Sequence, residues 1–426
     1  MSATPEARTT SRDYRRPYRP WPLAAANRVG RALGRVGLQT SFRESSLVAA
    51  ARRSTGLHFF DDDLFREPLR RLADALEREA DLHPLGRLIA RQGLLRVYRS
   101  RLLRAALVDL HPEIEATPVE APVFIVGLQR TGTTVLHRLL SLEPALRPLI
   151  SWEALSPAPD PAAPVETRAG ARDSRMRLAE LAEKSLRYIA PDFFAIHPVE
   201  AHSPEEDVLL LDLCGFGTTA EASQHVPSFS RWLESMDHRP AYRDFRSWIQ
   251  LLLWQRPGRW LGKTPHHLEH LDALLDVFPD ARIIQTHRDP LRVVPSFCSM
   301  ICHARGVFSD RVDPHEVGRH WGNKQIRMVE RAMALRDGDG VRGESFIDVH
   351  YRDLVTDPLK QVRQIYDFLG LALSSETEAQ MQGWIDANPR NRLGHHRYRV
   401  EDFGLVPGEI DERLADYRAR FDIPRE

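Results

Sequence analysis

The stretch Ala121-Pro-Val-Phe-Ile-Val-Gly-Leu-Gln-Arg-Thr-Gly-Thr-Thr-Val-Leu-His-Arg-Leu-Leu140 decides the fold. It predicts an apolar strand, a loop that contains Gly127 and Gly132, and then an amphipathic helix. The loop amides and the first turn of such a helix point unpaired N–H donors at one spot, and the helix dipole adds positive charge there. We therefore predict that this segment binds a phosphate group.

The spacing of the two glycines matches a Walker A loop, but the side chains differ from that motif. Thr133 stands where a nucleotide hydrolase carries its lysine, and a cation comes earlier, at Arg130. The loop is therefore not that of an ordinary ATPase. The alternative is a strand–helix turn in which the glycines serve only to make the turn tight. That alternative gives the run Arg130–Thr134 no role.

A second segment, Arg282-Ile-Ile-Gln-Thr-His-Arg-Asp-Pro-Leu-Arg-Val-Val-Pro-Ser296, predicts a buried strand that ends in a turn with Arg288 at its tip. Ligands of open α/β sheets bind at the carboxyl ends of the strands. Ser296 follows Arg288 by eight residues, inside the next predicted helix, and its hydroxyl can reach the same anion. Asp289 could also simply cap that helix.

Further strands are predicted at 346–349 and, more weakly, at 147–151 and 259–261, and helical patterns separate them. Strands that alternate with helices indicate a parallel sheet covered on both faces. We predict an α/β fold, a P-loop-like three-layer αβα domain with about five parallel strands. The expected parts are a basic, partly disordered leader (1–43), an N-terminal helical region (44–118) and the α/β domain (119–426) with a helical insertion at about 167–256.

Composition narrows the range of functions. The 426 residues include 59 basic and 59 acidic side chains, so no net charge attracts nucleic acid. No apolar run approaches the length of a membrane span, and the arginine-rich N-terminus lacks the apolar core of a signal peptide. The three cysteines fit a reducing compartment. A cytoplasmic location is therefore expected. The basic, weakly amphipathic stretch 21–38 leaves weak contact with a membrane surface open. Whether the chain forms a homo-oligomer is also open.

Together, the two segments resemble the family of sulfotransferases that depend on 3′-phosphoadenosine 5′-phosphosulfate (PAPS). The shared pattern is a strand ending in Gly-x4-Gly-Thr-Thr, then a strand ending in Arg-Asp-Pro with a serine eight residues past the arginine. Three more stretches resemble the bacterial branch of this family: 260–268 with Phe278-Pro279, 349–370, and 401–405. The resemblance covers residues of about 120 to 405.

The resemblance implies the donor site. The 5′-phosphosulfate would lie on Gln129, Arg130, Thr131, Gly132, Thr133 and Thr134, and the 3′-phosphate on Arg288 and Ser296. Tyr351 matches a position that often approaches adenine. The loop 388–398, with Arg390, Arg392 and Gly394, would lie near the 3′-phosphate. Two separate anion sites suit a donor of about four negative charges, and bidentate arginine contacts suit phosphate, so no metal is required.

In-line sulfuryl transfer places negative charge on the oxygen that leaves with the nucleotide. Arg130 and Lys263 are the candidates to stabilise it, and Lys263 is one of only four lysines beside 55 arginines. A general base must take the acceptor's proton. We rank Glu153 first, at the place where tyrosyl-protein and trehalose sulfotransferases carry a glutamate, and then Glu206, His202 and His266. Ser203, Pro204 and Glu206 also read as a helix-capping box.

The acceptor is expected to be an alcohol or phenol on a small molecule, lipid or glycan. Aromatic residues between 188 and 260 could line its pocket, although helix core explains most of them. Cys298, Cys302 and His303 are one helical turn apart and read as core filling, so no metal site is predicted. A Mg²⁺-dependent P-loop nucleotide kinase and a non-catalytic nucleotide-binding protein are the alternative functions.

Overall fold

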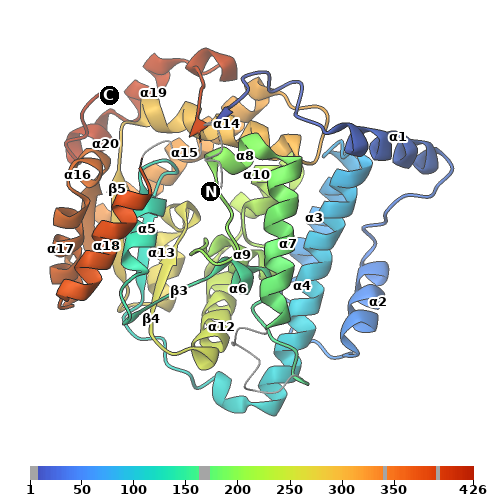
Figure 1. The fold of residues 1–426 in the computed structure, drawn as a ribbon, viewed down its shortest axis with the longest axis horizontal. Coiled ribbons are helices and arrows are strands. Elements are labelled where there is room, and N and C mark those ends of the chain that lie inside the picture. Colours follow the sequence, from blue (N-terminus) through green and yellow to red (C-terminus); the bar gives the residue numbers. More distant parts are fainter. Residues whose placement is uncertain (1–7, 163–172, 339–342, 390–393) are drawn as a thin grey trace, which may run out of the picture.

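The computed structural model (Figure 1) describes residues 8–162, 173–338, 343–389 and 394–426. It is built on a five-stranded parallel sheet of order β3-β4-β2-β5-β6. The strands are β2 (Val123–Gly127), β3 (Leu146–Pro148), β4 (Arg259–Lys263), β5 (Arg282–His287) and β6 (Phe346–His350). All five predicted strands are confirmed. The β3 strand is shorter than the predicted 147–151, and β4 extends two residues beyond its predicted end.

Alternation along the central strand β2 explains the three layers. Val123 and Ile125 pack into one cluster with α5, α16, α17 and α18, while Phe124 and Val126 pack into the larger core with α12 to α15. Both faces of the parallel sheet are therefore covered. The chain runs from β2 to one side of the sheet (β3, β4) and then to the other (β5, β6), so a crevice is expected where β2 ends.

The N-terminal helices pack as a group against the helices that follow β3. This group contains α1 (Trp21–Arg35), α2 (Glu44–Thr55), α3 (Arg66–Arg78), α4 (Pro84–Leu110) and η1 (Pro112–Ile114). Arg101 of α4 is fully buried and binds both carboxylate oxygens of Asp244 on α12, at 2.8 and 2.6 Å. This charge pair joins the N-terminal helices to the core of the molecule.

Helices also fill the chain between β3 and β4. They are α6 (Ser151–Leu155), α7 (Ser174–Ile189), α8 (Pro191–Ile196), α9 (Val208–Leu211), η3 (Asp212–Cys214), α10 (Thr219–Ser223), α11 (Pro227–Glu234) and α12 (Arg239–Gln255). Several aromatic side chains of this stretch are buried in the main core, among them Phe216, Phe229, Tyr242 and Trp248. The interpretation of these aromatics as helix core is confirmed for these residues.

The remaining elements surround the C-terminal half of the sheet. They are η4 (Pro265–Glu269), α13 (Leu271–Val277), α14 (Pro290–Gly306), α15 (Pro314–Asp337), η5 (Gly343–Ser345), α16 (Tyr351–Thr356), α17 (Pro358–Leu369), α18 (Ser375–Ala387), η6 (Val400–Phe403), α19 (Pro407–Arg413) and α20 (Ala415–Arg420). The division into leader, helical region and α/β domain stays a prediction. Within the described residues, no helix is long and apolar enough to cross a membrane.

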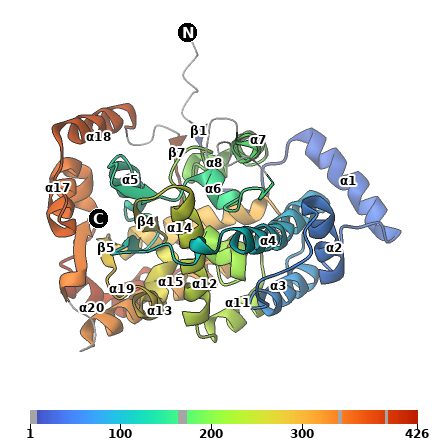
Figure 2. The ribbon, with the colours of Figure 1, turned by 90° about the horizontal axis from the view of Figure 1, so that it is seen from below.

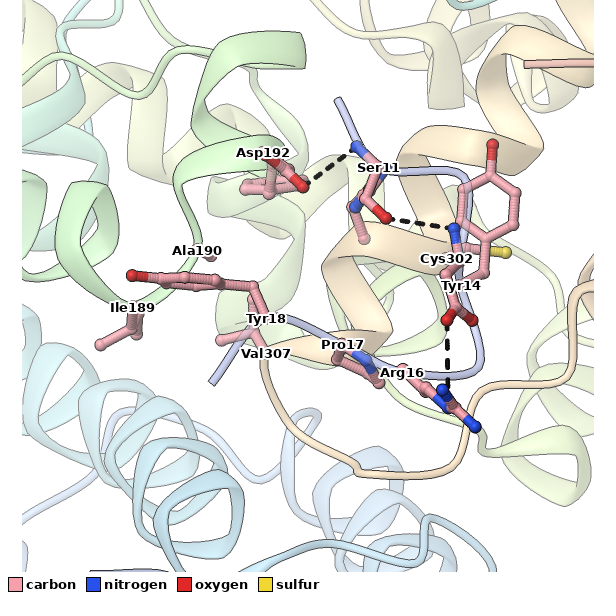
Figure 3. A pocket seen from close by; sticks show the side chains of 14 residues that line it. Ser11, Tyr14, Arg16, Pro17, Tyr18, Ile189, Ala190, Asp192, Cys302 and Val307 are labelled. Atoms are coloured by element: carbon pink, nitrogen blue, oxygen red, sulfur yellow. Dashed lines mark hydrogen bonds and ion pairs between the residues drawn. The ribbon is translucent and has the colours of Figure 1, made fainter. Parts of the chain in front are cut away.

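Residues 8–20, which we call the N-terminal strap, tie distant parts of the chain together. The strap begins with β1 (Arg8–Thr9), which pairs in parallel with β7 (Gly394–His395) (Figure 2). The Ser11 amide donates to Asp192 of α8 at 3.2 Å, and the Tyr14 hydroxyl lies 2.9 Å from that of Ser299 on α14. Figure 3 shows the small, partly open cavity beneath the strap, whose volume of about 30 Å³ has room for little more than water.

Candidate active site

The loop after β2 has the backbone that its glycines predict. Gly127 and Gly132 have φ of 137° and 92°, and a Cβ at Gly132 would lie 2.8 Å from Leu354 of α16. Arg130 also has a positive φ, of 70°, which is uncommon outside glycine. Helix α5 (Thr133–Leu140) starts directly after the loop, so the amides of its first turn have no partners within the helix.

The side chains of the predicted loop residues differ in their burial and in their hydrogen bonds. The hydroxyl of Thr131 is buried, donates to the Leu128 carbonyl at 2.6 Å and lies 2.6 Å from the hydroxyl of Thr286 on β5. Thr131 therefore fastens the loop to the sheet. Thr134 is exposed, and the buried Gln129 Oε1 has no hydrogen-bond partner among the described residues. Thr134 is thus open to a ligand in the first turn of α5, whereas Gln129 Oε1 is a buried acceptor.

The two predicted arginines meet at the same edge of the sheet. Arg288, just past β5, donates from Nη1 to the backbone carbonyl of Arg130 at 3.1 Å. Its guanidinium lies 3.9 Å from the ring centre of Tyr351, the first residue of α16. The Arg130 guanidinium donates to the carbonyl of Ile196 at 3.2 Å. Burial lowers the pKa of Arg130, although nearby Tyr398 and Tyr351 oppose that shift.

Lys263 ends β4, the neighbour of β2, and contacts a carboxylate. Its Nζ lies 2.6 Å from Glu206 Oε1, and the Thr264 hydroxyl donates to Glu206 Oε2 at 3.2 Å. The Lys263 side chain is 3% exposed and that of Glu206 is 20% exposed. Burial by itself would raise the pKa of Glu206, but Lys263 and His197 outweigh burial and lower it. Glu206 is therefore a carboxylate at neutral pH.

Glu206 reaches this position because its segment runs along the ends of two strands. The Glu205 amide donates to the carbonyl of Leu149, just past β3, at 2.8 Å, and the Asp207 amide donates to that of Lys263 at 3.1 Å. The Asp207 carboxylate lies against Gly262, where a Cβ would come within 2.0 Å of Oδ2. This role of Gly262 was not predicted, because only the folded chain brings Asp207 there.

A buried chain of polar groups supports the same segment. The Tyr242 hydroxyl lies 2.8 Å from Nδ1 of His267, whose Nε2 lies 3.2 Å from Asp207 Oδ2. The side chains of His267 and Asp207 are fully buried. This network was not predicted. It holds the backbone on either side of Glu206 and Lys263 in place.

His197, directly after α8, was also missed. It is half-buried, and its pKa is lowered by burial, raised by Glu205 and Glu206, and lowered by Lys263 and Arg130. These influences place the imidazole among the charged groups of the site. A histidine after the aromatic run Phe193-Phe194 was the only sequence signal, and that signal is weak.

Glu153, ranked first as the base, lies in a different setting. Both of its carboxylate oxygens bind the guanidinium of Arg147, at 2.7 and 2.8 Å, and Oε2 also accepts from the Ile150 amide at 3.0 Å. Only 5% of its side chain is exposed. A buried ion pair therefore holds this carboxylate, and among the described residues no hydrogen bond or ion pair links Glu153 to Lys263 or Glu206.

The remaining base candidates also lie outside the Lys263–Glu206 contact. His202 is 58% exposed and pairs with Glu180 at 3.0 Å. His266 is buried against His238 and His270. The predicted capping box at Ser203–Glu206 is wrong: α9 begins at Val208 without a side-chain cap, because Glu206 turns to Lys263 instead.

The predicted 3′-phosphate site is only partly described. Ser296 is buried in α14, the helix that begins two residues after Arg288. Gly394 lies in β7, whereas Arg390 and Arg392 fall outside the described residues. The Arg288 guanidinium is met by the side-chain carboxylate of Glu426, with Nη2 to Oε2 at 2.8 Å. An acidic group thus already lies on the arginine predicted to bind an anion.

The arrangement defines what the site can do. Two arginines and a glycine loop can hold a polyanion at the carboxyl edge of the sheet. A lysine in contact with a carboxylate can stabilise a leaving oxygen while the carboxylate accepts a proton.

Comparisons with known proteins agree with this geometry. The model of the sulfotransferase family matches residues 122–375. The chain is 25% identical over 323 residues to the omega-hydroxy-beta-dihydromenaquinone-9 sulfotransferase Stf3 of Mycobacterium bovis, across 71% of this chain and 76% of that protein. The crystal structure of STF1 from Mycobacterium tuberculosis superposes with a TM-score of 0.76 at 33% identity, over 88% of this chain and 98% of that one. STF9 from Mycobacterium avium gives 0.80 at 30% identity, over 90% and 98%.

Proposed function

The chain belongs to the sulfotransferase family, and on that premise we propose that it transfers the sulfuryl group of PAPS to a hydroxyl group, with Glu206 as the general base. The observation that carries the proposal is the 2.6 Å contact between Lys263 and Glu206 beside the glycine loop. It places a cation for the leaving oxygen and a base for the acceptor side by side. A cytoplasmic location stays a prediction.

The donor would span the two anion sites. Its 5′-phosphosulfate would meet the amides of the loop and α5, with Gln129, Arg130, Thr133 and Thr134 around it, while Arg288 and Ser296 would take the 3′-phosphate. The stacking of Arg288 on Tyr351 supports an adenine position beside that ring, because guanidinium and aromatic planes pack together. Thr131 would serve by locking the loop to β5.

The residues present account for each bond and each proton of the sulfuryl transfer. The acceptor oxygen attacks sulfur in line, the bond from sulfur to the bridging oxygen of the donor breaks, and the acceptor's proton passes to Glu206. The products are a sulfate ester and 3′-phosphoadenosine 5′-phosphate. If Lys263 turns to the bridging oxygen as charge develops there, its hold on Glu206 weakens. Burial then raises the pKa of Glu206 and makes it a better base at the moment of transfer.

For the acceptor, we propose a hydroxylated apolar molecule, such as a lipid. The relative from Mycobacterium bovis carries the name of a lipid-quinone sulfotransferase, and this support is by similarity. Within this chain, α1 and the residues after it expose an apolar, arginine-bearing surface that suits a lipid boundary. Phenolic and glycan acceptors are the alternatives that an acceptor screen would separate.

The donor site is tested first by binding. 3′-Phosphoadenosine 5′-phosphate with EDTA should raise the melting temperature of the wild type, and Arg288→Ala should lose most of that shift. Arg311→Ala is the matched control, because the Arg311 side chain is 87% exposed. A shift that requires ATP with Mg²⁺, or that survives in Arg288→Ala, would contradict the donor assignment.

The base is then tested by turnover from PAPS with a panel of phenols and long-chain alcohols. Glu206→Gln should lower kcat by about 10²- to 10⁴-fold, the usual range for a general base, and leave affinity for the bisphosphate nearly unchanged. Full turnover in Glu206→Gln would refute its role.

A further inference from the structure

Three buried histidines converge beside the end of β4. His238 precedes α12, His266 lies in η4 and His270 follows η4. One ring nitrogen from each can be chosen so that all three lie within 4.8 Å of one another. The residues are 3%, 4% and 7% exposed. They do not take part in the sulfuryl transfer described above, so the cluster requires another explanation.

The hydrogen bonds of the cluster leave lone pairs without partners. His238 Nε2 lies 3.1 Å from the Leu233 carbonyl, which can only accept, so Nε2 carries the hydrogen and Nδ1 carries a lone pair. His238 Nδ1 and both ring nitrogens of His266 are buried and have no hydrogen-bond partner among the described residues. A ring N–H that donates to a carbonyl while the other nitrogen faces inward is the arrangement typical of metal-binding histidines.

The surroundings keep the histidines neutral. Burial lowers the pKa of His238, and it lowers the pKa of His266 and His270 well below the ordinary range, with His238 and Lys324 adding to the lowering at both. Neutral imidazole is the form that binds metal ions. Lys324 itself is paired with Glu221 at 2.7 Å and with Glu269 at 3.7 Å, so its charge is compensated.

Packing alone accounts for only part of this cluster. The rings of His238 and His270 stack, with centres 3.5 Å apart and planes 14° apart, and this contact supplies dispersion energy. It does not satisfy the buried nitrogens, and a buried polar group without a hydrogen-bond partner destabilises the fold. Three apolar side chains would pack as well without that cost.

We propose that His238, His266 and His270 bind one Zn²⁺ ion, in a structural site separate from the sulfuryl-transfer chemistry. Nitrogen donors favour zinc and related transition metals, and Zn–N bonds of about 2.0–2.1 Å require the rings to turn inward from their stacked positions. Glu269 Oε2, which lies 3.9 Å from His270 Nε2, can supply a fourth ligand. An open groove lined by His238, Glu269, His270 and Arg331 gives the ion a path from solvent.

The location gives the ion a definite effect. His266 follows Lys263 by three residues, while His238 stands between α11 and α12. A bound ion would link these two segments and restrain the end of β4, where Lys263 contacts Glu206. The proposal does not depend on the identity of the acceptor or on Glu206 as the base.

The test uses the full chain with any affinity tag removed, stripped with EDTA and then dialysed. We expect calorimetry with Zn²⁺ to give one equivalent per chain, and Co²⁺ to give the visible absorption of a tetrahedral site, which Zn²⁺ then abolishes. Zn²⁺ should also raise the melting temperature of the wild type. The Co²⁺ spectrum requires no variant, so it decides the proposal even if substitutions unfold the chain.

Variants then assign the ligands. His238→Asn and His270→Asn should each weaken Zn²⁺ binding at least 100-fold, while His58→Asn, at an exposed position, should bind as the wild type does. Circular dichroism and the melting shift with 3′-phosphoadenosine 5′-phosphate show whether each variant is folded. Absence of stoichiometric binding in the wild type would overturn the proposal, as would unchanged binding in folded His238→Asn and His270→Asn.

Discussion

Glu206 is a carboxylate under opposing influences, and that makes its titration a sensitive reporter. Burial raises its pKa, whereas Lys263, His197 and the Thr264 hydroxyl lower it, with a net lowering. A base must be ionised to act, so the acid limb of kcat/KM should lie below the ordinary range of a glutamate. Thr264→Val removes the 3.2 Å hydrogen bond to Oε2 and should move that limb to higher pH.

The measurement is the pH profile of kcat/KM for wild type and Thr264→Val with the same acceptor. Ser247→Ala serves as the control, because Ser247 is a half-buried residue of α12 whose hydroxyl donates only to the Arg243 carbonyl, at 3.4 Å. If the limb stays in place or moves to lower pH in Thr264→Val, Glu206 is not the group that controls it.

Glu426 offers a second prediction, because its carboxylate lies on the guanidinium of Arg288. An incoming phosphate must displace it. Glu426→Gln should therefore tighten binding of 3′-phosphoadenosine 5′-phosphate by up to roughly fivefold, the equivalent of about 1 kcal/mol for a partly exposed pair. Calorimetry would check this against Glu412→Gln, at an exposed position. Weaker or unchanged binding would show that Glu426 does not compete with the ligand.

The roles of single residues were the least predictable feature of the site from the sequence. Glu153 and Glu206 are both glutamates at plausible positions, and only the tertiary structure shows one bound to Arg147 and the other to Lys263. The difference depends on the path of residues 203–207 along the ends of β3 and β4. No local pattern encodes such a path, because residues 203–207 lie more than fifty residues from their partners at Leu149, Ser151 and Lys263.

At the scale of elements, the glycine loop was predictable because its constraint is local. A turn between a buried strand and a helix needs left-handed backbone, and Gly132 supplies it with φ of 92°. Gly132→Ala should cost about 1–2 kcal/mol of unfolding free energy from the backbone alone and abolish the melting shift with 3′-phosphoadenosine 5′-phosphate. The added Cβ would also push on Leu354 and Tyr351.

The control for this substitution is Gly93→Ala in the middle of α4, where a Cβ meets nothing within 4 Å. It should leave ligand binding intact and stabilise the chain, since alanine is favoured over glycine in helices by about 1 kcal/mol. Denaturant unfolding of both variants provides the comparison. A Gly132→Ala variant that binds the bisphosphate normally would show that the loop tolerates a side chain there.

The strands were predictable for a similar reason. Buried parallel strands such as 123–127 and 282–287 are short apolar runs that carry their signal in sequence, and both were found. The edge strand β3 was predicted to be too long. The residues that follow it, 149–151, pair with residues 203–205 and not with the sheet. The proximity of His238, His266 and His270 was not predicted, because these histidines come from two separate segments of the chain.

A buried charge pair between α10 and α15 yields a stability prediction. Burial would raise the pKa of Glu221, but Lys324 and His320 lower it to about 2. Because the folded pKa lies below the unfolded value, the pair stabilises the chain above pH of about 4.5, and this contribution disappears as the pH falls toward 2. Glu221→Gln leaves Lys324 buried without its closest carboxylate and should cost about 3–5 kcal/mol near pH 7.

Urea unfolding of wild type and Glu221→Gln at several pH values would measure this. The difference between them should shrink as the pH is lowered. Glu67→Gln, an exposed change on α3, should stay within about 0.5 kcal/mol of the wild type throughout. A difference that grows in acid would mean that the pair is not ionised in the folded chain.

At the scale of the whole molecule, α1 lies at its periphery (Figure 1) and has three distinct sides. Its inner side is held by Asn27, whose side chain accepts from the Leu85 amide at 3.0 Å, and by Gly30 against Pro84. Its outer side carries Trp21, Val29 and Leu33, continued by Val36 and Leu38, with exposures from 45% to 81%.

The third side of α1 is basic. Arg28, Arg31 and Arg35 are exposed, and no acidic residue lies between Trp21 and Arg35. An apolar stripe bordered by arginines matches a helix that lies in the interface of an anionic membrane. The large exposed apolar area is otherwise unfavourable in water.

We therefore predict that the chain binds vesicles containing phosphatidylglycerol, weakly binds vesicles of phosphatidylcholine alone, and is released by salt. Val29→Asp should reduce flotation with anionic vesicles at least tenfold, because it places a charge in the centre of the apolar stripe and opposes the surface potential. Val406→Asp, an exposed apolar position on the C-terminal side of the molecule, is the matched control. If instead the wild type is a dimer in solution that Val29→Asp dissociates, and vesicles do not bind, the stripe belongs to an interface between two copies. Vesicle binding by a monomer would mean that α1 holds the chain at a lipid surface, which is where a hydroxylated lipid acceptor would be found.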